Sequence, residues 1–128
     1  MTQVQKELFT DLSQKQCETV EGGALLLIES IQALTANADW IGKDDTYMTV
    51  DGAKRWGVHK FSSGQNRNVG YFQSFSGSVR VNLFDEDGWL NPDDYMGGRT
   101  ISDTPTNGAA TTIVSGGGSQ YAIKYQVI

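Results

Sequence analysis

The chain has 128 residues, of which 38% are hydrophobic and 20% charged, as expected for one globular domain. Fifteen acidic residues against ten basic ones give a net charge of −5. The chain therefore lacks the clustered positive charge that nucleic-acid binding requires, and we expect no nucleic-acid partner. Fifteen glycines against two prolines favour turn-rich β structure over a helical bundle.

Residues 1–23 differ from the rest of the chain. They are polar, and the isolated apolar residues Phe9, Leu12, Cys17 and Val20 have a spacing that fits one weak stripe on a helix. The segment lacks the basic start and long apolar core of a general secretory signal. One interpretation is an N-terminal helix that ends at a glycine.

The same segment resembles the double-glycine leader of bacterial proteins exported by peptidase-containing ABC transporters. The positions that carry the resemblance are Leu12-Ser13, Gln16, Cys17, Val20 and Gly22-Gly23. Two glycines allow an extended chain to enter a narrow peptidase cleft where side chains would not fit. The resemblance implies such a transporter as partner, cleavage after Gly23, and a secreted or otherwise extracytoplasmic domain of residues 24–128. The single cysteine, Cys17, would leave with the leader, which suits a location without disulfides.

Residues 25–36 are mostly apolar and fit two kinds of element. Leu27, Ile28, Ile31 and Leu34 have helical spacing, and their propensity favours a helix. A buried first strand over residues 25–31 fits equally well.

From residue 45 onward, patterns of strands and turns dominate. Val79, Val81 and Leu83 alternate with polar residues, as on one face of a strand. The dipeptide Asp51-Gly52 and the glycine-rich run 115–119 are turn signals. Strands are expected over residues 45–50, 69–75, 78–84, 111–114 and 121–128. Short strands at this spacing predict an all-β fold, an antiparallel β-sandwich of about seven or eight strands.

The acidic residues of this domain are concentrated in two short stretches. One contains Asp39, Asp44 and Asp45, and the other contains Asp85, Glu86, Asp87, Asp93 and Asp94. If the fold brings the stretches together, like charges meet at close range, which is costly unless a cation neutralises them. Two solvated acidic turns that never meet are the alternative.

The two stretches resemble the calcium loops of C2 domains, which are calcium-dependent phospholipid-binding β-sandwiches. In that family one loop has two aspartates six positions apart before Pro-Tyr-Val-x-Val, and another reads Asp-x-Asp followed by an aspartate three positions before a glycine. The matching positions here are Asp39, Asp45 before Thr46-Tyr47-Met48-Thr49-Val50, Asp85-Glu86-Asp87, and Asp94 before Gly97. The departures are Thr46 in place of the proline and a domain shorter than most members.

The resemblance implies a Ca²⁺ site with a defined set of ligands. These ligands are Asp39, Asp45, Asp85, Asp87 and Asp94, with Asp93 as the alternative to Asp94. Asp44, Glu86 and Asp93 are otherwise expected to point outward. The resemblance also favours a strand for residues 25–34. Calcium takes six to eight oxygen ligands, whereas one His and no cysteine beyond Cys17 provide poorly for zinc or copper.

Large apolar residues follow the predicted ligands: Trp40-Ile41 come directly after Asp39, and Trp89-Leu90 come after Asp87-Gly88. In C2 domains, bulky residues at such positions enter the lipid headgroup region once calcium has neutralised the loops. The resemblance therefore implies contact with anionic phospholipid or another cell-surface component. The alternative is that both tryptophans fold back over the metal site or the end of the sandwich.

The sequence contains no Ser/His/Asp set, phosphate-binding loop or cofactor motif. The lone His59 is expected to be a surface or turn residue. We interpret the chain as an exported, non-enzymatic calcium-binding module. Two alternatives remain open: a metal-independent structural or secreted effector protein, and a small carboxylate hydrolase, which would need a substrate cleft.

Overall fold

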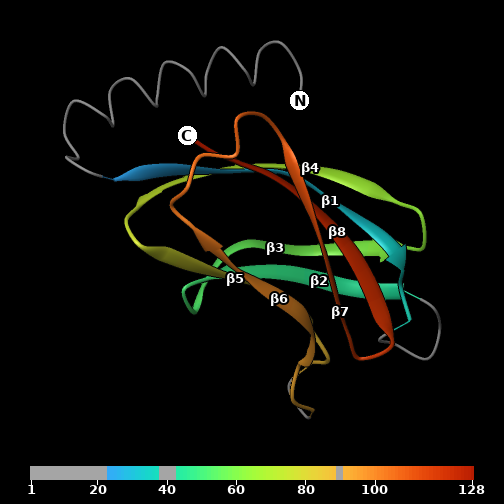
Figure 1. The fold of residues 1–128 in the computed structure, drawn as a ribbon. Coiled ribbons are helices and arrows are strands. Elements are labelled where there is room, and N and C mark those ends of the chain that lie inside the picture. Colours follow the sequence, from blue (N-terminus) through green and yellow to red (C-terminus); the bar gives the residue numbers. More distant parts are fainter. Residues whose placement is uncertain (1–22, 38–42, 89–90) are drawn as a thin grey trace.

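The computed structural model describes residues 23–37, 43–88 and 91–128. Within these ranges eight strands form two antiparallel sheets that pack face to face, which confirms the predicted β-sandwich (Figure 1). No helix in the described part of the chain has the length and apolar character needed to span a membrane. The strands are β1 (Ala24–Thr35), β2 (Lys43–Val50), β3 (Ala53–Ser62), β4 (Asn66–Phe75), β5 (Ser78–Asp85), β6 (Asp94–Ser102), β7 (Ala110–Gly116) and β8 (Ser119–Val127).

One sheet has the strand order β4-β1-β8-β7, and the other has the order β3-β2-β5-β6. The core lies between them, because alternate side chains of each strand point to the facing sheet. Its largest fully buried side chains come from both sheets: Leu26, Ile28, Ile31, Met48, Val50, Phe61, Leu83, Met96, Tyr121 and Ile123.

The ambiguous segment 25–36 is a strand that contains a β-bulge. The register of β1 shifts between Ile28 and Ser30 against both of its neighbours. Ile28 and Ile31 therefore both face the core although they are three residues apart. This bulge explains the helical spacing of the apolar residues in the sequence.

The sequence does not predict the strands β3 and β6. Both are edge strands of the same sheet, and most of their side chains are partly or fully exposed. Exposed edge strands tolerate glycine and charge, so their hydrophobic alternation is weak. Asp94, which the sequence places in a loop, is the first residue of β6.

Candidate metal site

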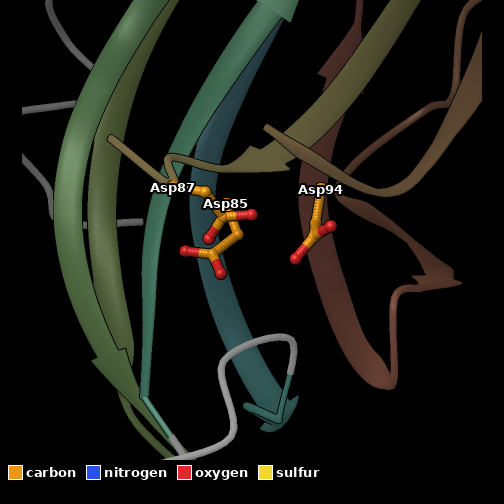
Figure 2. A group of neighbouring side chains, drawn as sticks. All are labelled: Asp85, Asp87 and Asp94. Carbon is orange, nitrogen blue, oxygen red and sulfur yellow. The ribbon is translucent and has the colours of Figure 1, made fainter. Parts of the chain in front are cut away.

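Three aspartate side chains meet at one end of the sandwich, where β5 ends and β6 begins. Asp85 and Asp94 are paired across these two strands, and Asp87 lies in the segment between them. One carboxylate oxygen from each residue lies within 4.8 Å of the oxygens of the other two. Figure 2 shows the carboxylate of Asp94 opposite those of Asp85 and Asp87. The fold thus brings together three of the five predicted ligands.

Asp85 is the most buried member of this cluster, with 1% of its surface exposed. Its Oδ1 accepts a hydrogen bond of 2.6 Å from the backbone N–H of Asp45. Its Oδ2 is also buried, but accepts no hydrogen bond from any residue in the described ranges. Burial of a polar atom without a hydrogen-bond partner lowers the stability of the folded state. A cation bound to this oxygen would offset that loss.

Burial also raises the pKa of Asp85, from 3.8 to about 7. The hydrogen bond from Asp45 opposes this change, whereas the negative charges of Asp44 and Asp87 add to it. At neutral pH and without a cation, a substantial fraction of the molecules therefore carries a proton on Asp85. A cation bound here would compete with that proton.

The remaining predicted ligands, Asp45 and Asp39, are not in the cluster. Asp45 is half-buried in β2, and its backbone carbonyl accepts a hydrogen bond of 2.8 Å from Glu86. Its backbone thus holds both Asp85 and Glu86. Asp39 lies outside the described residues. The same is true of the predicted contact and cleavage residues Trp40, Ile41, Trp89, Leu90 and Gly22.

The expectation that Asp44 points outward is wrong. This residue is fully buried, and its Oδ2 accepts hydrogen bonds from Ser119 Oγ at 2.8 Å and Tyr121 OH at 2.6 Å. Both donors lie on β8 of the facing sheet, and they compensate for the burial of the carboxylate. Alternation along β2 explains the error, because Asp44 is in phase with the buried residues Met48 and Val50. That phase was visible in the sequence.

Asp93 and Glu86 are exposed, as expected. Asp93 accepts hydrogen bonds from Tyr47 OH and, at 3.2 Å, from the backbone N–H of Asp87. Burial and the hydrogen bond to Asp93 raise the pKa of Tyr47 to about 12. Of the two candidate ligands Asp93 and Asp94, Asp94 belongs to the cluster. Asp93 instead links the segment after β5 to β2 through its hydrogen bonds with Asp87 and Tyr47.

His59 lies on β3 rather than in a turn. Its ring stacks on that of Trp56, with the ring centroids 4.0 Å apart and an angle of 12° between the planes. Burial, together with the positive charge of Arg67, lowers its pKa. These contacts give His59 a packing role in the sheet.

No family model matches the sequence, and no curated protein matches it. Several solved structures match the fold, and C2 domains are among them. One, described as the structure of a C2 domain, has a TM-score of 0.51 at 18% identity, over 82% of this chain and 96% of that one. A C2 domain of plant extended synaptotagmin 1 has a TM-score of 0.52 at 12% identity, over 83% of this chain and 92% of that one. The fold is C2-like. At these identities the likeness concerns the fold alone.

Proposed function

We propose that this C2-like protein is a non-enzymatic calcium-binding module and that Asp85, Asp87 and Asp94 hold the ion. The observation that carries the proposal is the buried Oδ2 of Asp85, which lacks a hydrogen-bond partner among the described residues and belongs to a group of three carboxylates. A cluster of exposed acids alone would be ordinary surface. A buried and unsatisfied member makes a ligand the simplest way to complete the site.

The geometry of the cluster suits calcium in particular. Calcium binds oxygen at roughly 2.3–2.6 Å, so two oxygens on opposite sides of one ion lie at most about 5 Å apart. The limit of 4.8 Å within the cluster agrees with this span. Asp45 is the proposed fourth carboxylate ligand, and its backbone N–H is already bonded to Asp85. Asp39 remains a proposed ligand on the strength of its spacing in the sequence.

The test is isothermal titration calorimetry of the full chain with CaCl₂. Asp87→Asn and Asp94→Asn each remove a charged ligand, and we expect each to weaken calcium binding about tenfold or more. Glu86→Gln is the matched control, because it removes the same charge from an exposed position between two ligands, and it should change the dissociation constant by less than about threefold.

Two results would contradict the calcium site. If the full chain shows neither heat of binding nor a higher Tm at millimolar calcium, the protein does not bind calcium at this site. If Glu86→Gln weakens binding as much as Asp87→Asn does, the loops attract calcium only through their overall charge.

We further propose that the calcium-loaded end contacts anionic phospholipid through Trp40, Ile41, Trp89 and Leu90. The support is their position in the sequence, within three residues of the proposed ligands Asp39 and Asp87. Vesicles of phosphatidylserine and phosphatidylcholine should sediment the protein with calcium but not with EDTA. A Trp40→Ala/Trp89→Ala variant should lose vesicle binding while retaining the calorimetric calcium signal. Equal sedimentation of this variant and the wild type would refute the contact.

We also propose that residues 1–23 are removed during export by a peptidase-containing ABC transporter, which yields an extracytoplasmic protein. The support from the fold is that β1 begins at Ala24. Leu25 and Ile128 exchange two backbone hydrogen bonds of 2.9 Å, and cleavage after Gly23 would break neither of them. Mass spectrometry of the product exported by a co-expressed transporter should give Ala24 at its N-terminus, and Gly23→Val should block its release. A product that retains Met1 would refute the leader.

A further inference from the structure

The two sheets meet along their β6 and β7 edges. These strands belong to different sheets and are in contact along the same side of the sandwich. Their backbones approach each other closely at two glycines. A Cβ at Gly97 would lie 2.6 Å from the backbone N and O of Ser115, and one at Gly116 would lie 2.7 Å from the backbone O of Tyr95. The absence of side chains at these positions allows the two edges to approach.

Further along β6, away from the metal site, a cleft of about 410 Å³ lies between the same two edges. This volume is in the range of small-molecule sites in proteins. The cleft is lined by Arg99, Thr100, Ile101, Ser102, Thr104, Thr106, Thr111, Thr112, Tyr125 and Val127. The lining thus contains one cation, six hydroxyl-bearing serine and threonine residues and no carboxylate.

Arg99 provides the charge of the cleft. Its Nε donates a hydrogen bond of 2.7 Å to Thr112 Oγ1, which fixes the guanidinium between β6 and β7. Neither Nη atom of Arg99 donates a hydrogen bond to a described residue. Arg99 also forms no ion pair within the described ranges, where the ion pair found joins Lys124 to Glu29. The planar edge of a guanidinium is suited to bidentate binding of a carboxylate, sulfate or phosphate group.

The other groups of the cleft suit a hydroxylated ligand. The hydroxyls of Thr104 and Thr111 make no hydrogen bond within the described part of the chain, whereas Thr106 Oγ1 is already bonded to Gly108 and Val127. Tyr125 and Ile101 add apolar surface. The nearest acid in sequence, Asp103, accepts a hydrogen bond of 2.8 Å from the backbone of Gly77, outside the cleft lining.

We propose that this cleft binds an acidic sugar, with the carboxylate, sulfate or phosphate group of the sugar on Arg99. The sugar hydroxyls would exchange hydrogen bonds with Thr104 and Thr111, and an apolar face of the ring would lie against Tyr125. None of the residues of the metal site lines the cleft, so sugar binding does not require calcium.

The test is a titration of the ¹⁵N-labelled full chain followed by NMR, in EDTA and in calcium. The probes are D-glucuronate, inorganic phosphate and D-glucose. We expect glucuronate to give saturable shifts at the Arg99 Nε–H and at the amides of Thr104, Thr111 and Thr112, with the same dissociation constant in both buffers. Phosphate should bind more weakly because it lacks the ring, and glucose more weakly because it lacks the charge.

Variants then test the role of the guanidinium. Arg99→Gln should weaken glucuronate binding about tenfold or more, and Arg99→Lys should restore only part of the loss. Arg55→Gln removes the same charge from exposed β3, outside the cleft, and should change binding by less than about twofold. Thermal unfolding of each variant shows whether it remains folded.

Three outcomes would overturn the proposal. The first is the absence of saturable shifts with glucuronate at tens of millimolar. The second is phosphate binding as tight as that of glucuronate, which would leave an oxyanion site without a sugar. The third is loss of binding in EDTA or in Asp87→Asn, which would assign the effect to the metal site.

Discussion

The pH dependence of stability gives the sharpest test of how Asp85 is held. Its pKa of about 7 in the folded protein lies above the value of 3.8 expected in the unfolded chain. Between these two values the folded state keeps a proton that the unfolded state has lost, so stability falls as pH rises through this window. The loss is complete above pH 7, where Asp85 must be charged in both states. The proposed calcium ion should reverse the trend, because it would replace the proton and bind only the folded state.

The magnitude follows from the two pKa values. The difference between 3.8 and about 7 corresponds to about 4 kcal/mol of unfolding free energy. Asn at this position cannot ionise, and its carbonyl oxygen can still accept the hydrogen bond from Asp45. Its NH₂ group can donate hydrogen bonds toward Asp87 and Asp94, so the substitution leaves no buried donor without an acceptor. In EDTA at pH 8, Asp85→Asn should therefore exceed the wild type in stability by up to about 4 kcal/mol.

The assay is urea unfolding in EDTA at a series of pH values from 4 to 8, with the wild type, Asp85→Asn and Glu86→Gln in parallel. The difference between wild type and Asp85→Asn isolates Asp85, because groups such as His59 titrate equally in both proteins. Glu86→Gln should give a curve parallel to that of the wild type, since this side chain is exposed. Parallel curves for Asp85→Asn and the wild type would refute the reasoning. Lower stability of Asp85→Asn at pH 8 would refute it as well.

Two further substitutions test the packing around the two sites. Tyr121→Phe leaves the buried Asp44 carboxylate with one hydrogen-bond donor fewer and should lower the unfolding free energy by about 1–3 kcal/mol. The control Tyr95→Phe, at an exposed ring, should lower it by less than about 1 kcal/mol. Gly97→Ala places a Cβ 2.6 Å from the backbone of Ser115 and should lower the unfolding free energy by about 3 kcal/mol or more. Gly108 also has a positive φ but free space around it, so the control Gly108→Ala should lower it by about 1–2 kcal/mol. Urea unfolding measures both.

The sequence predicted the elements whose burial alternates cleanly. The residues Val79, Val81 and Leu83 of β5 all face the core, and the turn at Asp51-Gly52 separates β2 from β3 as expected. The sequence was ambiguous at β1, because the bulge after Ile28 interrupts the alternation and imitates a helical period. The edge strands β3 and β6 gave no clear signal, since their burial is partial.

The aspartate cluster was predictable because it is local. Asp85 and Asp94 face each other across the β5–β6 hairpin, so a pattern within one short segment contains all three carboxylates. The cleft was not predictable in this way. It depends on the approach of β6 and β7 at Gly97 and Gly116, which belong to different sheets and have no mutual pattern in the sequence.

Asp44 connects the metal site to the facing sheet. Its carboxylate is held by Ser119 and Tyr121 of β8, yet its charge also raises the pKa of Asp85. Asp44→Asn keeps an oxygen for both donors and removes the charge, so the pKa of Asp85 should fall while remaining above 3.8 because burial persists. In EDTA, the window in which stability falls should therefore end at a lower pH than in the wild type. Asp51→Asn, at the turn between β2 and β3, is the control. An unchanged window in Asp44→Asn would show that the charge of Asp44 does not contribute to the pKa of Asp85.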